Sequence, residues 1–359
     1  MKVLGIGEIL WDVFPDQELL GGAALNFCAN LRRLGDLPTL LSGIGQDPRG
    51  SLACTAMKQL GLAIDFVQTI NRLPTGVATV KMNSDGEPHF VIQRPLAFDG
   101  ITLSTKLLET LAPFEFDWLY FGTLMQTDPE VERATHELAS HLPGVRCFYD
   151  MNLRAGHWNF ELVKRLCGLA SILKLNESEA EIMAELSGTI RAEFSLETVC
   201  REWAARFEID VICVTLGPRG CLIYQDGSAL RVPGVSNTVR DTVGSGDAFA
   251  AAFLHGHHRG WPMSQRARFA IALGALVASL PGATSDWLSR QQRSLPPRLP
   301  VRLRQPQNVG RSQRACTPGT RQHGLDLFPL LPALREKGWR INSNGKANTH
   351  ALNVGMFIS

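Results

Sequence analysis

Residues 241–247 read Asp-Thr-Val-Gly-Ser-Gly-Asp, and residues 248–254 continue as Ala-Phe-Ala-Ala-Ala-Phe-Leu. The first part has the composition of a tight turn, because glycine adopts backbone conformations that other residues avoid. The second part is apolar and rich in alanine, the strongest helix former. The pattern therefore predicts a turn that opens into a buried helix, with the carboxylate of Asp247 in the first helical turn.

This predicted helix start is compatible with two roles. The first N–H groups of a helix have no partner inside the helix and lie at the positive end of its dipole, so they can bind an anion. A carboxylate beside them can accept the proton of a hydroxyl group. Together these features indicate phosphoryl transfer to an alcohol. The alternative is an ordinary helix-capping arrangement, in which Asp247 only stabilises the helix start.

The sequence before this stretch alternates between strand and helix patterns. Strands are predicted at residues 1–7, 39–45, 118–121, 145–149, 172–175, 211–214 and 221–224. Helical patterns lie between most of them, and a further apolar helix is predicted from Arg266 to Ser279. Such alternation predicts a mainly parallel sheet covered by helices. Residues 75–94 instead alternate with a period of two around an Asn-Ser-Asp-Gly turn at 83–86, which predicts a hairpin added to the sheet.

The body of the chain and its C-terminal part differ in charge. The 359 residues are 45% hydrophobic and 19% charged, which is typical of soluble globular proteins. Residues 288–359 carry a net charge of +10 and residues 1–287 a net charge of −8, so nucleic-acid binding by the body is not expected. Residues 288–325 include eight arginines, five prolines and no acidic residue. We therefore predict a domain over 1–287 and a disordered or non-native basic tail over 288–359.

Several classes of protein are disfavoured by motifs that the sequence lacks. No apolar run reaches the roughly 18 residues of a membrane span, and the first residues do not form a signal peptide, so the cytoplasm is the expected location. The eight cysteines form no CxxC pair, which favours reduced thiols over disulfides or zinc. GxxxxGK[ST], GxGxxG and HExxH motifs do not occur, which argues against P-loop, dinucleotide-binding and zinc-protease sites.

Polar residues and glycines follow the predicted strands where a ligand would bind. In open parallel sheets, ligands bind beyond the carboxyl ends of the strands. The residues that follow three of these strands are Asp150, Asn152 and Arg154, then Asn176 and Glu179, then Thr215, Gly217 and Gly220. Each group also has a purely structural interpretation, such as a helix N-terminus at residues 176–179 or a turn between strands at 217–220. Their joint placement nevertheless predicts a nucleotide-sized site.

Five motifs in this order resemble the ribokinase-like (PfkB) family of carbohydrate kinases. Residues 241–247 and the helix that follows resemble the C-terminal signature of the family, and residues 21–35, which begin Gly-Gly-Ala-Ala-Leu-Asn, resemble its N-terminal signature. Gly43-Ile44-Gly45-Gln46-Asp47 to Gly50, Asn176-x-x-Glu179 and Thr215-x-Gly217-x-x-Gly220 occur in the family's order. The resemblance covers residues 1–287. It implies a ribokinase-like three-layer α/β/α sandwich with a mainly parallel sheet, and a small β-sheet lid formed by residues near 10–20 and 75–94.

The resemblance also implies roles for individual residues in ATP-dependent phosphorylation of a sugar hydroxyl. Asp247 would be the general base, and the backbone amides of Gly244, Ser245 and Gly246 would form the anion hole. The residues implied for the sugar are Asp12, Gly22, Asn26, Arg94 and Arg154. Those implied for ATP and its Mg²⁺ are Asn176, Glu179, Thr215, Gly217, Gly220 and Gly274. Glu179 would hold Mg²⁺ through water, and Asp241 would lie near a K⁺ site.

Within the family, the closest resemblance is to fructokinases. It rests on Trp11-Asp12 and on Asp150-x-Asn152-x-Arg154 with Trp158, so fructose is the favoured substrate. A 2-keto-3-deoxygluconate kinase, in which an arginine meets the substrate carboxylate, or a ribokinase is an alternative. A catalytically silent sugar-binding protein is an alternative of a different class. Lid sheets in this family often pair, which implies a homodimer, and the resemblance fades after Gly282-Ala283.

Overall fold

The computed structural model describes residues 1–82, 88–188, 194–285 and 287. Within them the chain forms one nine-stranded sheet and a separate four-stranded sheet. The predictions made for the tail at 288–359 and for the turn at 83–86 concern residues outside this described part. None of the helices in the described ranges combines the length and the apolar character needed to cross a membrane.

The nine-stranded sheet is mainly parallel. From one edge to the other its strands are β13 (Ser228–Pro233), β12 (Gly220–Gln225), β11 (Val211–Thr215), β10 (Ile172–Asn176), β9 (Arg146–Asp150), β8 (Trp118–Gly122), β1 (Lys2–Ile6), β4 (Leu37–Gly45) and β5 (Val67–Ile70). All neighbours from β11 to β5 pair in parallel, whereas β12 and β13 form an antiparallel extension. The parallel strands therefore end at one common edge, where ligands bind in such sheets.

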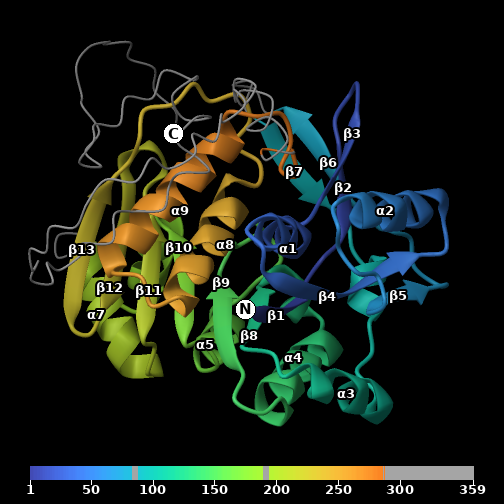
Figure 1. Ribbon diagram of the computed structural model, residues 1–359, viewed down its shortest axis with the longest axis horizontal. Coiled ribbons are helices and arrows are strands. Elements are labelled where there is room, and N and C mark those ends of the chain that lie inside the picture. Colours follow the sequence, from blue (N-terminus) through green and yellow to red (C-terminus); the bar gives the residue numbers. More distant parts are fainter. Residues whose placement is uncertain (83–87, 189–193, 286, 288–359) are drawn as a thin grey trace, which may run out of the picture. The chain divides into compact units, whose positions relative to one another are not determined.

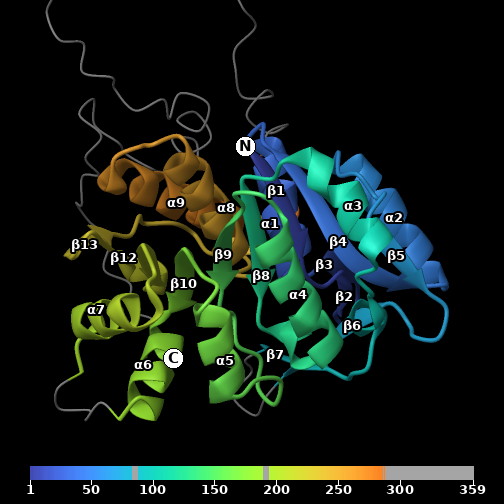
Figure 2. The ribbon, with the colours of Figure 1, turned by 90° about the horizontal axis from the view of Figure 1, so that it is seen from below.

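Helices cover both faces of this sheet (Figures 1 and 2). One face carries α1 (Ala23–Arg33), α8 (Ser245–His258) and α9 (Met263–Ala278), and α8 contacts the other two. The opposite face carries α4 (Pro129–His141), α5 (Phe160–Cys167), α6 (Glu177–Leu186) and α7 (Leu196–Phe207). Two more helices, α2 (Pro48–Gln59) and α3 (Thr105–Leu111), lie toward the β5 edge. The result is three layers, with the sheet in the middle.

The small sheet contains the predicted hairpin. Its strands lie in the order β3 (Glu18–Gly21), β2 (Leu10–Val13), β6 (Gly76–Met82) and β7 (Pro88–Ile92). β6 and β7 pair antiparallel, which confirms the hairpin predicted from the period of two. Asp12, Ala78 and Ile92 are register partners across β2, β6 and β7, and all three are buried. One face of the small sheet is therefore covered, and it carries the Asp12 carboxylate.

Helix α8 is buried on nearly all sides because it lies between α1 and α9. Its residues from Asp247 to Gly256 are buried, and half of them are alanine or glycine, which lets neighbouring helices approach closely. Gly274 of α9 faces this helix: a Cβ there would lie 3.0 Å from the carbonyl oxygen of Ser245. The alanine-rich stretch therefore fixes the first turn of α8 at the carboxyl edge of the sheet.

The predicted fold class is confirmed, with one local correction. Strand β9 extends to Asp150, so this residue ends the strand and does not follow it. The histidines at 255, 257 and 258 lie in the last turns of α8. His255 is 7% exposed, and its Nδ1 lies 2.7 Å from the Oδ2 atom of the buried Asp36. The sequence did not reveal this partner because Asp36 is far away along the chain.

Candidate active site

Asp247 and Asn26 meet at the carboxyl edge of the large sheet. Asn26 Nδ2 donates to Asp247 Oδ2 at 2.8 Å, and the two residues are 3% and 7% exposed. This contact joins α1 to α8 and so brings the N-terminal and C-terminal motifs together. Asn26 Oδ1 is buried and has no hydrogen-bond partner in the described chain. An unpaired buried carbonyl is costly, so this position favours a ligand hydroxyl that donates to it.

Burial gives Asp247 an unusually high pKa. Burial of the carboxyl group and, less strongly, the nearby charge of Asp150 raise its pKa from 3.8 to about 7. Lys174, the Asn26 hydrogen bond and Arg154 act in the opposite direction. A carboxylate with a pKa near neutral pH is suited to accept a proton and later release it.

The turn before α8 leaves backbone N–H groups available. Gly244 has a φ of 76°, the left-handed conformation, and directly precedes the helix. The amide of Ser245 already donates to Thr242 O at 3.2 Å. The amides of Gly244 and Gly246 donate to no acceptor in the described ranges. Of the three predicted anion-hole amides, those of Gly244 and Gly246 can therefore donate to a bound anion. The amide of Ser245 instead stabilises the turn.

Asp12 lies beside the chain segment that enters α1, since a Cβ at Gly21, the neighbour of Gly22, would lie 2.5 Å from Asp12 Oδ2. Burial raises the pKa of Asp12 to about 7, and the charge of Arg154 lowers it. Gly22 has a φ of 110°, and a Cβ there would lie 2.2 Å from the carbonyl oxygen of Glu8. Glycine is therefore required at this entry to α1. The charge of Asp247 also acts on Asp12, so the structure places these two carboxylates near each other.

Glu8, two residues after the end of β1, was not among the site residues predicted from the sequence. The residue is 7% exposed, and its Oε1 accepts a hydrogen bond from the Ala23 amide at 2.8 Å. Burial raises the pKa of this carboxyl group, and Arg154 lowers it. Glu8, Asn152 and Arg154 line a small cavity together with residues at the end of β8. An acidic residue shortly after a buried strand was the signal that could have found it.

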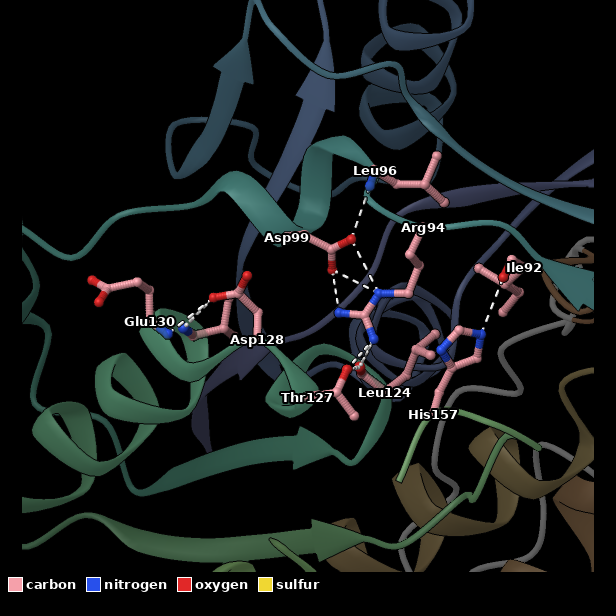
Figure 3. Close-up of polar contacts among 10 residues, drawn as sticks. Ile92, Arg94, Leu96, Asp99, Leu124, Thr127, Asp128, Glu130 and His157 are labelled. Atoms are coloured by element: carbon pink, nitrogen blue, oxygen red, sulfur yellow. Dashed lines mark hydrogen bonds and ion pairs between the residues drawn. The ribbon is translucent and has the colours of Figure 1, made fainter. Parts of the chain in front are cut away.

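Arg154 lies in this site, whereas Arg94 is held by other protein groups. The charge of Arg154 acts on Asp12 and Asp247 as well as on Glu8. Figure 3 shows the guanidinium of Arg94 directed at Asp99, and its Nε lies 3.1 Å from both carboxylate oxygens. Arg94 also donates to Thr127 and to the carbonyl oxygen of Leu124. All three of its side-chain nitrogens therefore have protein acceptors.

Asn176 and Glu179 form the capping box of α6. Asn176 Oδ1 accepts from the Glu179 amide at 2.9 Å, and Glu179 Oε2 accepts from the Asn176 amide at 2.8 Å. Glu179 Oε1 also accepts from the Leu153 amide at 2.7 Å. Both carboxylate oxygens are thus engaged, yet each keeps a further lone pair. The described residues contain no cluster of three or more His, Cys, Asp or Glu side chains that could hold a metal ion. This donor set suits Mg²⁺ bound through water.

Three further residues predicted for the nucleotide, Thr215, Gly217 and Gly220, lie at the turn between β11 and β12. Thr215 Oγ1 lies 3.5 Å from Leu175 O at the end of β10. Gly217 begins the short 3₁₀ helix η5 (Gly217–Arg219), which joins β11 to β12, and Gly220 follows it. A Cβ at Gly220 would lie 2.0 Å from the Val232 carbonyl oxygen. The segment at 217–220 therefore forms the turn between strands that its glycines also predicted. This structural role is compatible with a role in nucleotide binding.

Asp241 ties together two loops beside the start of α8. Its Oδ1 accepts from the Val243 amide at 3.0 Å, and its Oδ2 accepts from the Gly282 amide at 2.9 Å. Gly282 follows α9 and lies near the small sheet, since a Cβ there would lie 3.3 Å from Leu19 Cδ1. Each carboxylate oxygen keeps a lone pair that could face a cation.

Lys174 and Asp150 form an ion pair that the sequence analysis did not identify. Lys174 Nζ lies 2.8 Å from Asp150 Oδ1 and 3.1 Å from Oδ2, and both side chains are buried. The signal was a lysine inside the apolar strand sequence Ile-Leu-Lys-Leu at 172–175. The pair lies beneath the first turn of α8, because a Cβ at Gly246 would be 3.4 Å from Lys174 Nζ.

The chain resembles known carbohydrate kinases over most of its length. The model of the pfkB family of carbohydrate kinases matches residues 15–290. A fructokinase from Escherichia coli is 28% identical over 310 residues, which covers 81% of this chain and 97% of that protein. A probable fructokinase-5 from Arabidopsis thaliana is 25% identical over 272 residues, which covers 70% of this chain and 81% of that protein.

Solved structures of sugar kinases share the fold. The crystal structure of fructokinase with bound ATP from Xylella fastidiosa has a TM-score of 0.69 and 21% sequence identity, and the match covers 79% of this chain and 94% of that one. The aminoimidazole riboside kinase from Salmonella enterica has a TM-score of 0.65 and 24% identity over 79% of this chain and 96% of that one. At this identity the likeness concerns the fold alone. The family match, which spans most of the sequence, establishes that the chain belongs to the pfkB family of carbohydrate kinases.

Proposed function

We propose that this kinase transfers the terminal phosphoryl group of ATP to a hydroxyl of a neutral sugar and that fructose is its preferred substrate. The observation that carries the proposal is the 2.8 Å contact between Asn26 and Asp247 at the start of α8. It places a carboxylate with a pKa of about 7 beside an unpaired amide oxygen and beside free backbone N–H groups. Deprotonation of a sugar hydroxyl and stabilisation of a phosphoryl group can therefore occur at one place.

Asp247 acts as the general base in this proposal. It takes the proton from the acceptor hydroxyl, whose oxygen attacks the terminal phosphorus as the bond to the ADP oxygen breaks. The N–H groups of Gly244 and Gly246 stabilise the charge on the transferring group, and Ser245 holds the turn that presents them. Phosphoryl transfer needs positioning and charge neutralisation more than covalent help from the protein.

The charge of the sugar side favours a neutral substrate. Arg154 is close enough to Glu8, Asp12 and Asp247 to act on all three carboxyl groups. Its charge is therefore already balanced, and a substrate carboxylate would meet repulsion from the acidic neighbours. This argues for fructose over 2-keto-3-deoxygluconate. The fructokinases among the relatives support the same choice.

On the sugar side, Asp12, Asn26 and Arg154 would contact the hydroxyls, and Gly22 would let the backbone approach. Arg94 would act from a distance, because its guanidinium is already bound to Asp99, Thr127 and Leu124. The small sheet would close over the sugar as a lid and exclude water, which otherwise competes as the acceptor.

ATP would lie along the ends of β10 and β11, near Thr215, Gly217 and Gly220. Gly274 would contribute by letting α9 approach the start of α8. Glu179 and Asn176 would hold Mg²⁺ through water, and the ion would neutralise phosphate charge. Asp241 would support K⁺ binding. Pairing of two copies through the small sheet and a cytoplasmic location stay predictions from the sequence.

The proposal is tested by measuring ADP release from the full chain with Mg-ATP and a panel of sugars. The panel contains fructose, ribose and 2-keto-3-deoxygluconate, each with and without K⁺. We expect sugar-dependent ADP release with the highest kcat/KM for fructose. A higher kcat/KM for 2-keto-3-deoxygluconate would show that Arg154 serves a substrate carboxylate. Absence of sugar-dependent ADP release from folded protein would support a silent sugar-binding protein instead.

The pH dependence of turnover is a second expectation. Because the pKa of Asp247 is about 7, the ionised base is lost as the pH falls through that value. We expect kcat/KM for the sugar to decline below about pH 7 and to level off above it. Asp12 titrates in the same range, so the profile of Asp12→Asn serves as a control. A profile that stays flat down to about pH 5 in both proteins would contradict the role of Asp247.

A further inference from the structure

A buried ion pair lies where strands β9 and β10 end beneath helix α8. Lys174 and Asp150 are register partners on these neighbouring strands. Asp150 is fully buried, Lys174 is 7% exposed, and the distances from Nζ to the two carboxylate oxygens are 2.8 and 3.1 Å. Removing two charges from water is expensive, and apolar residues often replace such pairs without loss of stability. The pair therefore calls for a role beyond stability.

The ammonium group of Lys174 points at the turn that starts α8. A Cβ on Gly246 would lie 3.4 Å from Nζ, so the lysine reaches the first helical turn from below. An ammonium group has three N–H donors. In the described part of the chain those of Lys174 go to Asp150 and to no other acceptor. The remaining donor and the free amide of Gly246 are therefore available to the same anion.

Two cations lie near Asp247, and they act on different acidic neighbours. The charge of Arg154 acts on Glu8 and Asp12 and so belongs to the sugar side. The charge of Lys174 acts on Glu179 as well as on its partner Asp150, which places it on the side of the predicted Mg²⁺ and phosphates. Asp247 is affected by both cations. Both cations therefore lie near the carboxylate that would deprotonate the sugar hydroxyl.

We propose that Lys174 contacts the transferring phosphoryl group of ATP and that Asp150 is the positioning residue that holds its ammonium group there. This inference rests on the proposed kinase function. A charge-assisted hydrogen bond from Nζ strengthens as negative charge develops on the phosphoryl oxygens, so the contact contributes more in the transition state than in the ground state.

Asp150 is itself held by a second residue, Tyr120. Tyr120 Oη donates to Asp150 Oδ2 at 3.3 Å, and the ring of Tyr120 stacks on Phe27 with centroids 3.8 Å apart. Phe27 belongs to α1, the helix that carries Asn26. The position of the lysine is therefore set by the same layer that sets the contact between Asn26 and Asp247.

The test compares Lys174→Met with Lys164→Met, in the full chain. Lys164 of α5 forms a solvent-accessible ion pair with Glu161 at 2.6 Å and is a matched control. Isothermal titration should show that Lys174→Met weakens binding of a non-hydrolysable ATP analogue by about 10- to 100-fold, the loss expected for one charged hydrogen bond. Binding of ADP, which lacks the transferring group, should change by less than about threefold. The control variant should bind both nucleotides like the wild type.

A second variant separates this role from folding. Lys174→Met alone leaves the Asp150 carboxylate buried without its partner and is expected to lower the Tm. The double variant Lys174→Met/Asp150→Asn removes both charges and should recover Tm. Its kcat should stay at least about 10-fold below that of the wild type, with the sugar KM little changed. Recovery of kcat together with Tm, or equal weakening of ATP analogue and ADP, would overturn the proposal.

The proposal for Lys174 and the proposed kinase function are tested by different measurements and can fail separately. Sugar-dependent ADP release by the wild type tests the function, whereas the ratio of analogue to ADP affinity tests the lysine. A wild type without sugar-dependent turnover in which the variant still loses analogue affinity would reject the function and keep the phosphate contact. A wild type with turnover and no change in the variant's affinity or kcat would reject the contact alone.

Discussion

Replacement of Asp247 by Asn is expected to lower kcat by about 10³-fold, within the range that general-base catalysis contributes. The amide cannot accept the proton of the sugar hydroxyl, although it keeps the shape of the side chain. Its oxygen can still accept the hydrogen bond that Asn26 Nδ2 donates at 2.8 Å in the native chain. Sugar and ATP-analogue affinities, measured by titration calorimetry, should therefore stay close to those of the wild type.

The thermal stability of Asp247→Asn shows whether a loss of turnover comes from the missing base or from unfolding. The pKa of Asp247 is raised to about 7 in the folded chain, chiefly by burial. Above the unfolded-state pKa the folded chain holds the proton more tightly than the unfolded chain, so stability is lost as the pH rises through the folded pKa. Asp247→Asn removes this loss, and its Tm at about pH 8 should equal or exceed that of the wild type. Near-normal turnover of the variant would show that another group is the base.

Gly244→Ala is expected to cause the second large loss. The residue has a φ of 76°, and a Cβ there would lie 2.3 Å from the Cβ of Ala283. The left-handed conformation alone costs a non-glycine residue about 1–2 kcal/mol, and the contact with Ala283 forces the turn to move. Displacement of one anion-hole donor lowers kcat by about 10²- to 10³-fold. Steady-state kinetics with saturating sugar and ATP measure this loss.

Gly260→Ala is the matched control for Gly244→Ala. Gly260 has a φ of 68°, and a Cβ there would meet no atom within 4 Å. The substitution therefore carries the same backbone strain without the collision, at the far end of α8. Thermal unfolding should show a lower Tm for both variants, whereas kcat should fall only for Gly244→Ala. An equal kcat in the two variants would show that the turn at 244–246 does not position the phosphoryl group.

The sequence allowed the architecture to be predicted because its signals are local. The period of two at 75–94 predicted the β6–β7 pair, and the glycine-rich turn before an apolar run predicted the start of α8. The contact between Asn26 and Asp247 spans 221 positions. No local sequence pattern relates residues so far apart. The contact could be predicted only because each residue belongs to a motif that resembles a signature of the same family.

The parts of the site that were not predicted depend on tertiary contacts. Lys174 occurs in an apolar strand, and only the register with β9 reveals that it meets Asp150. Arg94 was expected at the sugar, but a sequence cannot show that Asp99 binds its guanidinium first. Glu8 follows a strand as many acids do, and only its burial sets it apart. Burial and partner choice are properties of the packed chain.

The central claim is that the chain moves the terminal phosphoryl group of ATP to a sugar hydroxyl with Asp247 as base. The most direct measurement is ³¹P NMR of the products formed from Mg-ATP and fructose, for the wild type and for Asp247→Asn side by side. We predict that a sugar phosphomonoester grows in step with ADP in the wild-type reaction and stays at background in the variant. ADP accompanied by inorganic phosphate without an ester, or equal ester formation by both proteins, would contradict the account.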